Sequence, residues 1–131
     1  MRIYLPLPAA KAKELPAGGA IALHAGEIVW CPDEAGEEAE YEAQLDAVWA
    51  QALDTPEERV VLVSADTGVA LSPVPGVELP NVRSVTVAGN ARIASYHLSE
   101  LTGGEIEASG EDPELLWYAP QEIALLRARL S

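Results

Sequence analysis

Residues 59–64 read Arg-Val-Val-Leu-Val-Ser, a short run of β-branched and aliphatic side chains between polar ends. Successive side chains of a strand point to opposite faces of a sheet, so an unbroken apolar run is typical of a strand that is buried on both faces. We therefore expect residues 59–64 to form a central strand, around which the other elements are arranged.

The segment before this strand predicts a long helix, from about residue 33 to residue 53. Apolar residues recur at spacings of three and four, which is the period of one helix face. The residues of this apolar stripe are Tyr41, Leu45, Val48, Trp49, Ala52 and Leu53. Glutamates crowd the first turns, where the positive end of the helix dipole favours anions. Pro56 ends the helix, because a residue that precedes proline avoids the helical conformation.

Shorter elements are expected on both sides of this pair. Strands are predicted at residues 2–7, 20–24, 82–87, 93–98 and 115–118, a short helix at 9–15 and a final helix at 120–130. Pro6 and Pro8 place the first strand at a sheet edge or end it early, because proline cannot donate a ladder hydrogen bond. The polar, glycine-rich residues 101–113 are predicted to form a loop.

This order of elements predicts the α+β class. We expect a mixed sheet of about five or six strands, with one long and one C-terminal helix packed on it and the helices on one face. No boundary divides the chain, so residues 1–131 are expected to form a single domain. No apolar run is long enough to span a bilayer, and the lone Cys31 cannot form an internal disulfide. A cytoplasmic location is expected.

The formal net charge of −13 is the most unusual number in the composition. Twelve acidic residues and no basic one lie between Lys13 and Arg59, and seven more acids without a base lie between Arg92 and Arg127. Such a chain repels the phosphates of nucleic acid and of anionic membranes, so neither is expected as a partner. It attracts a basic protein, although acidity that serves only solubility remains the alternative. The candidate partner-binding acidic face comprises Glu37, Glu38, Glu40, Glu42 and Asp46.

Three short patterns suggest chemistry, and each has a simpler explanation. Asp66-Thr67-Gly68 after a strand resembles the way in which aspartic proteases present a carboxylate, but that chemistry needs two such aspartates. His24 with Glu27 and His97 with Glu100 share one spacing, and convergence of the two pairs on a metal is left open. Cys31 has no histidine placed beside it to activate it. We expect no metal and no cofactor.

A ligand pocket is the remaining candidate site. Trp117, Tyr118, Gln121 and Glu122 combine aromatic rings with an amide and a carboxylate within six residues. Such a cluster is typical of a small-ligand or peptide pocket, whereas packing of the aromatic rings in the core is the alternative.

Four segments, in this order, resemble one family. They are Met1-Arg-Ile-Tyr-Leu-Pro6, Gly36-Glu-Glu-Ala-Glu-Tyr41, Arg59-Val-Val-Leu-Val-Ser-Ala-Asp66 and Glu114-Leu-Leu-Trp-Tyr-Ala-Pro-Gln-Glu122. The chain resembles a family of small, acidic bacterial proteins of unknown function, mostly from actinomycetes. Pro120 stands where that pattern has threonine, and residues 101–113 are shorter than the pattern, so that a helix there would be missing. The resemblance implies a small cytoplasmic protein and assigns no activity or residue role.

The function favoured by these observations is a non-catalytic protein-interaction or regulatory domain whose acidic face meets a basic protein. The alternative is a small enzyme or small-ligand binder that uses the pocket near Trp117, Tyr118 and Glu122. A homodimer is compatible with both.

Overall fold

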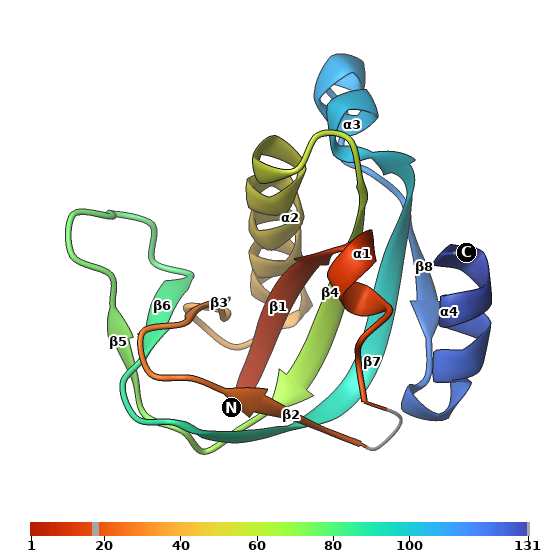
Figure 1. Cartoon of the computed structure of the whole chain (residues 1–131). Helices are drawn as coiled ribbons and strands as arrows, with labels where there is room; N and C mark the ends of the chain where they lie inside the picture. The colour runs from red at the N-terminus through yellow and green to blue at the C-terminus, as the bar shows by residue number, and fades with distance from the viewer. Residues whose placement is uncertain (17–18, 131) are drawn as a thin grey trace.

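The computed structural model describes residues 1–16 and 19–130, and its elements are labelled in Figure 1. In chain order they are β1 (Arg2–Pro8), α1 (Ala9–Ala12), β2 (Ala20–Leu23), β3 (Ile28–Trp30), α2 (Glu37–Asp54), β4 (Arg59–Asp66), β5 (Leu71–Pro73), β6 (Val82–Val85), β7 (Gly89–Thr102), α3 (Gly103–Ser109), β8 (Leu115–Tyr118), the 3₁₀ helix η1 (Pro120–Glu122) and α4 (Ile123–Leu130). None of the described helices is both long and apolar enough to cross a membrane.

The strands join in one antiparallel sheet. Their order is β2-β7-β4-β1-β3-β6-β5, and β8 pairs separately with β7. The α+β class is confirmed, but within the described residues every strand pair is antiparallel, so the sheet is not mixed. It has eight strands rather than five or six. The two strands that the sequence does not predict, β3 and β5, have three residues each, too few for an alternating pattern.

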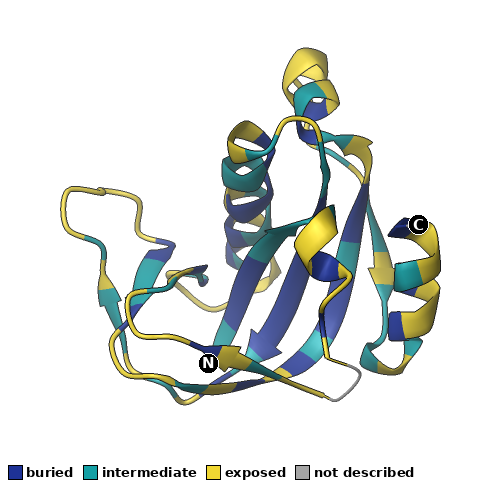
Figure 2. Cartoon of the chain, viewed as in Figure 1, coloured by how far each residue is buried: buried dark blue, intermediate teal, exposed yellow. Residues whose placement is uncertain are grey.

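The prediction for residues 59–64 is confirmed. β4 lies between β1 and β7, and all its residues except the two at its ends are buried (Figure 2). Val61 and Val63 enter one hydrophobic core, whereas Val60 and Leu62 enter a second core on the opposite face of the sheet. The sheet is therefore the middle layer of the protein, and both of its faces are covered.

The expectation that the helices share one face is wrong. Side chains of α1 and α4 contribute to the core that contains Val61, and those of α2 and α3 contribute to the core that contains Leu62. A strand that is apolar on both sides needs a cover on both sides, and the C-terminal helix provides part of the second one. We call the two sides of the sheet the α4 face and the α2 face.

Helix α2 begins at Glu37, later than predicted, because the preceding residues form bends and Gly36 has a φ of 121°, outside the helical region. Its buried face is made mainly of alanines, namely Ala39, Ala43, Ala47 and Ala52, together with Val48. Tyr41 and Leu53, which the predicted stripe included, are exposed. Small side chains let the helix axis approach the sheet closely, which a count of large apolar residues does not detect.

Residues 101–113 are not a loop, because they contain helix α3. Thr102 and Glu105 form a capping box, in which each side chain accepts a hydrogen bond from the backbone N–H of the other residue, at 3.3 and 3.0 Å. The helix ends at Gly110, which has a φ of 68°. The expectation that this chain lacks a helix here is therefore wrong.

Candidate functional site

A β-bulge positions the polar side chains of the candidate site. One extra residue in β7, Ala94, lies opposite β4 and shifts the alternation of the following side chains by one position. Tyr96 and Leu98 consequently enter the core on the α4 face. Ser95 and His97, which alternate with them, face α2.

His97 and two buried serines form a hydrogen-bonded cluster on this face. The imidazole Nε2 atom lies 3.1 Å from Ser95 Oγ and 3.3 Å from Ser64 Oγ. Ser64 comes from β4, next to β7, and both serines are almost completely buried. Because the hydroxyls hold one ring nitrogen, the orientation of the imidazole is defined by the sheet itself.

His97 is neutral at physiological pH. Burial, together with a smaller contribution from the positive charge of Arg2, lowers its pKa from 6.5 to about 4. A side chain with a pKa so far below neutrality is a weak general base at pH 7. The cluster is therefore suited to hydrogen bonding rather than to proton abstraction.

A hollow of about 410 Å³ opens beside His97, between α2 and the segment that leads into β8. We call it the α2 groove. Its lining residues come from α2, β7, that segment and the start of β8. They are Tyr41, Gln44, His97, Asp112, Pro113, Glu114 and Leu115.

One exposed aromatic side chain lines this groove, and a second lies on the strand beside it. Tyr41 lines it and is 53% exposed. Trp117 lies directly opposite His97 in the β7–β8 pair and is 61% exposed. Cross-strand neighbours have Cβ atoms roughly 5 Å apart, so the indole extends the surface that the groove begins.

The charge of the groove is negative. Its lining contains the carboxylates of Asp112 and Glu114 and no lysine or arginine among the described residues. Asp112 Oδ1 accepts a hydrogen bond of 3.2 Å from Trp49 Nε1, which fixes this carboxylate against α2. The nearby Arg2 is already paired with both oxygens of Asp66, at 2.8 and 3.2 Å. Arg2 also holds the pKa of Asp66 below its usual value.

The comparison with known families agrees with the resemblance of the four segments. The model of a family of unknown function (DUF6912) matches residues 1–126. The chain belongs to this family. No curated protein and no solved structure shows a significant match to this chain. Membership of the family brings no activity and no residue role, so the site is judged on its geometry.

The predicted pocket residues near the C-terminus are divided between two faces. Trp117 is on the α2 face, beside His97, whereas Tyr118 packs against the core on the α4 face. Gln121 is exposed in η1. Glu122 Oε1 accepts a hydrogen bond of 2.8 Å from the Ala119 N–H and so caps the start of η1. None of these four residues lines the α2 groove.

The predicted acidic residues of α2 do not share one face either. Glu38, Glu42 and Asp46 follow one another at a spacing of four residues and form one exposed row. The carboxylate of Asp46 accepts a hydrogen bond from Asn81, and burial raises its pKa. Glu37 lies one turn before Tyr41, on the side of the groove, and Glu40 lies toward Arg2 and Tyr4.

The structure separates the remaining candidates. No group of three or more His, Cys, Asp and Glu side chains that could hold a metal occurs among residues 1–16 and 19–130, so the two His–Glu pairs do not converge. Glu27 Oε1 instead accepts a hydrogen bond of 3.0 Å from the His24 N–H. Cys31 is buried, which raises the pKa of its thiol. Asp66 is paired with Arg2.

Proposed function

We propose that this family member is a non-catalytic interaction domain whose α2 groove binds a basic segment of a partner protein. The observation that carries the proposal is the composition of the groove. Two carboxylates and the exposed ring of Tyr41 line it together with a neutral histidine, Trp117 lies beside it on the paired strand, and no lysine or arginine among the described residues lines it.

Each part of the groove suits an arginine or lysine side chain. The carboxylates of Asp112 and Glu114 accept charge-assisted hydrogen bonds from a guanidinium or ammonium group. The faces of Tyr41 and Trp117 attract the same cations through their quadrupoles and cover the aliphatic stems. A neutral His97 at the base adds no repulsion.

The acidic residues of α2 add attraction over a longer range. Glu37 and Glu38 lie one turn from Tyr41, so they continue the negative surface from the groove along the helix. Glu40, Glu42 and Asp46 surround the rest of the helix and increase the rate of encounter with a basic partner without contacting it. The salt dependence of binding follows from both contributions.

Catalysis by the Ser–His cluster is less well supported. The pKa of His97, about 4, is far from the operating pH that an efficient general base matches. The small-ligand alternative built on Trp117, Tyr118 and Glu122 lacks a common cavity, because Tyr118 faces the opposite side of the sheet.

The proposal is tested with a pair of variants that change net charge equally. Asp112→Asn with Glu114→Gln removes both groove carboxylates, and the asparagine keeps an acceptor for Trp49 Nε1. Glu57→Gln with Glu78→Gln removes two exposed carboxylates that do not line the groove. Fluorescence anisotropy with a labelled deca-arginine peptide measures affinity at low and at physiological ionic strength.

We expect the groove variant to bind the peptide at least about tenfold more weakly, because two charge-assisted contacts are lost. The control pair should lose less than about threefold, since exposed charges act only at long range. Trp117→Ala should cost about two- to fivefold, the size of one exposed cation–π contact. If the groove variant and the control pair lost the same affinity for the peptide, binding would depend on net charge alone and the proposal would be wrong.

A further inference from the structure

The sheet forks on one side of β1. β1 pairs with β4 from Arg2 to Pro8, but its described pairing with β3 is limited to Tyr4 opposite Trp30. Beyond Tyr4, the side of β1 that faces β3 has no strand partner among the described residues. Pro6 and Pro8 lie in this part.

The two prolines are compatible with an interior strand because of the direction in which they point. The Thr67 N–H donates to the Met1 carbonyl, so the odd-numbered residues of β1 direct their backbone groups to β4. The even-numbered residues Tyr4, Pro6 and Pro8 therefore direct theirs to the fork. β1 lies between β4 and β3 and runs through Pro8, so the expectation that the prolines place this strand at a sheet edge or end it early is wrong. The prolines are tolerated because they face the fork, where no strand requires an N–H donor from them and they present only carbonyl acceptors.

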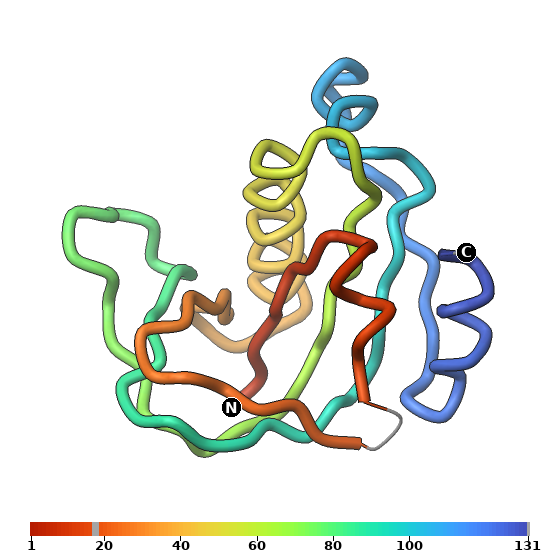
Figure 3. The backbone as a smooth tube through the Cα atoms, in the orientation of Figure 1, coloured from red at the N-terminus to blue at the C-terminus, as the bar shows by residue number. Residues whose placement is uncertain are grey.

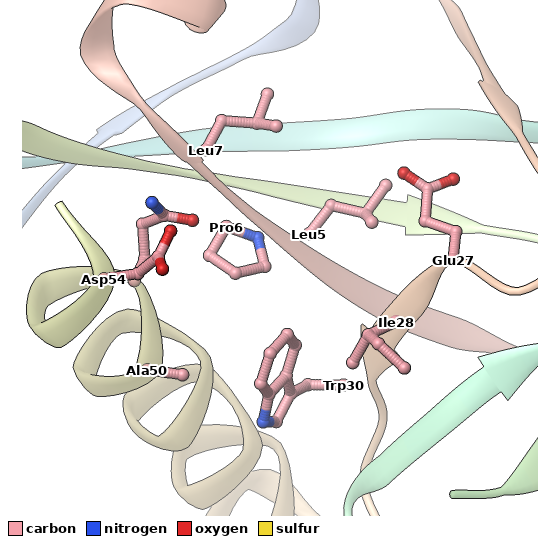
Figure 4. Close-up of a pocket in the computed structure, with 9 residues that line it drawn as sticks. Leu5, Pro6, Leu7, Glu27, Ile28, Trp30, Ala50 and Asp54 are labelled. Atoms are coloured by element: carbon pink, nitrogen blue, oxygen red, sulfur yellow. The ribbon is translucent and has the colours of Figure 1, made fainter.

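A second hollow, of about 350 Å³, occupies this fork under the C-terminal end of α2 (Figure 4). Its residues come from β1, from the start of β3 and from the last turn of α2. They are Leu5, Pro6, Leu7, Glu27, Ile28, Trp30, Ala50, Gln51 and Asp54. We call it the fork pocket.

The middle of the fork pocket is apolar and its ends are acidic. Figure 4 shows the carboxylates of Asp54 and Glu27 on opposite sides, with Pro6, Leu5 and the ring of Trp30 between them. The pocket is lined by no lysine or arginine among the described residues. The Gln51 amide already donates 2.9 Å to Thr55 Oγ1. Unoccupied polar capacity in the pocket is therefore mainly acceptor capacity.

The position of Asp54 makes one acidic end unusually favourable for a cation. Asp54 is the last residue of α2, where the negative end of the helix dipole disfavours a carboxylate, and the last turn contains no basic residue. Glu27 is held by the sheet, since its carbonyl accepts a hydrogen bond of 2.9 Å from the Val85 N–H. Glu27 Oε1 accepts the His24 N–H, and neither carboxylate has an ion-pair partner among the described residues. A positive charge at each end would therefore be favourable.

We propose that the fork pocket binds a short linear diamine, with one ammonium group at Asp54, the other at Glu27 and the methylene chain along Trp30. Ammonium groups supply only donors, which matches a pocket of acceptors, and a methylene chain matches the apolar middle. This site is separate from the α2 groove, so neither proposal depends on the other.

The test uses 1,4-diaminobutane as the ligand, with 1-aminobutane and 1,4-butanediol as controls that carry one charge and none. Titrations are followed by the ¹H–¹⁵N signal of the Trp30 indole, which reports on the pocket itself. Glu27→Gln with Asp54→Asn removes both charges while preserving size. Glu57→Gln with Glu78→Gln is the charge-matched control, and Asp112→Asn with Glu114→Gln checks independence from the α2 groove.

We expect a saturable shift of the Trp30 signal with the diamine, at least about tenfold weaker binding of 1-aminobutane, and no binding of the diol. The fork variant should lose the diamine shift, whereas the other two variant pairs keep it. Absence of a saturable shift, equal binding of the monoamine, or equal weakening by all three variant pairs would overturn the proposal.

Discussion

Replacing Gly103 with alanine should lower the free energy of unfolding by about 2–3 kcal/mol. A Cβ atom at this position would lie 2.3 Å from the carbonyl oxygen of Ala52 and 2.8 Å from its Cα atom. Both are backbone atoms in the last turns of α2, so no side chain can rotate away. The helix pair α2–α3 would have to separate to accept a single methyl group.

Backbone hydrogen bonds make this separation costly. The Gly103 N–H donates 2.8 Å to the Glu58 carbonyl, and the Gly104 N–H donates 2.8 Å to the Pro56 carbonyl. Displacing α3 would weaken these bonds and shift Ile106, which is fully buried in the core on the α2 face. Overpacking would thus be combined with lost hydrogen bonds.

Urea denaturation followed by circular dichroism measures the effect, with Gly68→Ala as the control. Gly68 has no heavy atom within 4 Å of an added Cβ, so this variant should stay within about 0.5 kcal/mol of the wild type or gain slightly. If Gly103→Ala were as stable as Gly68→Ala, the close contact between α2 and α3 described here would be incorrect.

Acid should destabilise the protein through His97, by up to about 3 kcal/mol. The pKa of His97 is about 4 in the folded chain, against 6.5 for an unperturbed histidine. The folded state binds this proton more weakly than the unfolded state does. Its contribution to stability is therefore fully present above pH 6.5, decreases as the pH falls, and is lost below about pH 4.

The measurement compares the wild type with His97→Gln across this pH range. Carboxyl groups that titrate in acid act in both proteins and cancel in the difference. We expect the stability difference between the two proteins to change by up to about 3 kcal/mol between neutral pH and pH 4. His24→Gln is the matched control, because His24 is exposed. A pH-independent difference for His97→Gln would mean that the imidazole is not desolvated.

Part of the fold follows from the sequence alone. The apolar run of β4 and the charged start of α2 were recognised because each has a local pattern. The C-terminal strand and helix were found for the same reason. Helix α3 was missed, since its glycines suggested a loop, although Thr102-x-x-Glu105 is a capping-box signal that would have identified it. The glycine at its start serves close packing rather than a turn.

The candidate site was less predictable. Trp117 and His97 were each noted, but only their pairing across β7 and β8 brings them together. The bulge at Ala94 decides which face of the sheet His97 occupies. No residue pattern near Ala94 predicts this bulge. Tyr41 was assigned to the core because its spacing fits the buried side of a helix, yet alanines occupy that side. Asp112 and Glu114 depend on the position of α3, which the loop prediction left undefined.

The place of β1 in the sheet has a consequence for protein synthesis. β1 is the earliest strand of this chain, and Figure 3 shows it running through the middle of the molecule, between segments that follow it in sequence. Its main partner, β4, is translated roughly three to twelve seconds after it at ordinary elongation rates. During that interval β1 lacks the one strand that pairs with it along its whole length, and only the single pair with β3 is available to it. The longest pairing of β1 therefore cannot form until the chain has been synthesised as far as Asp66.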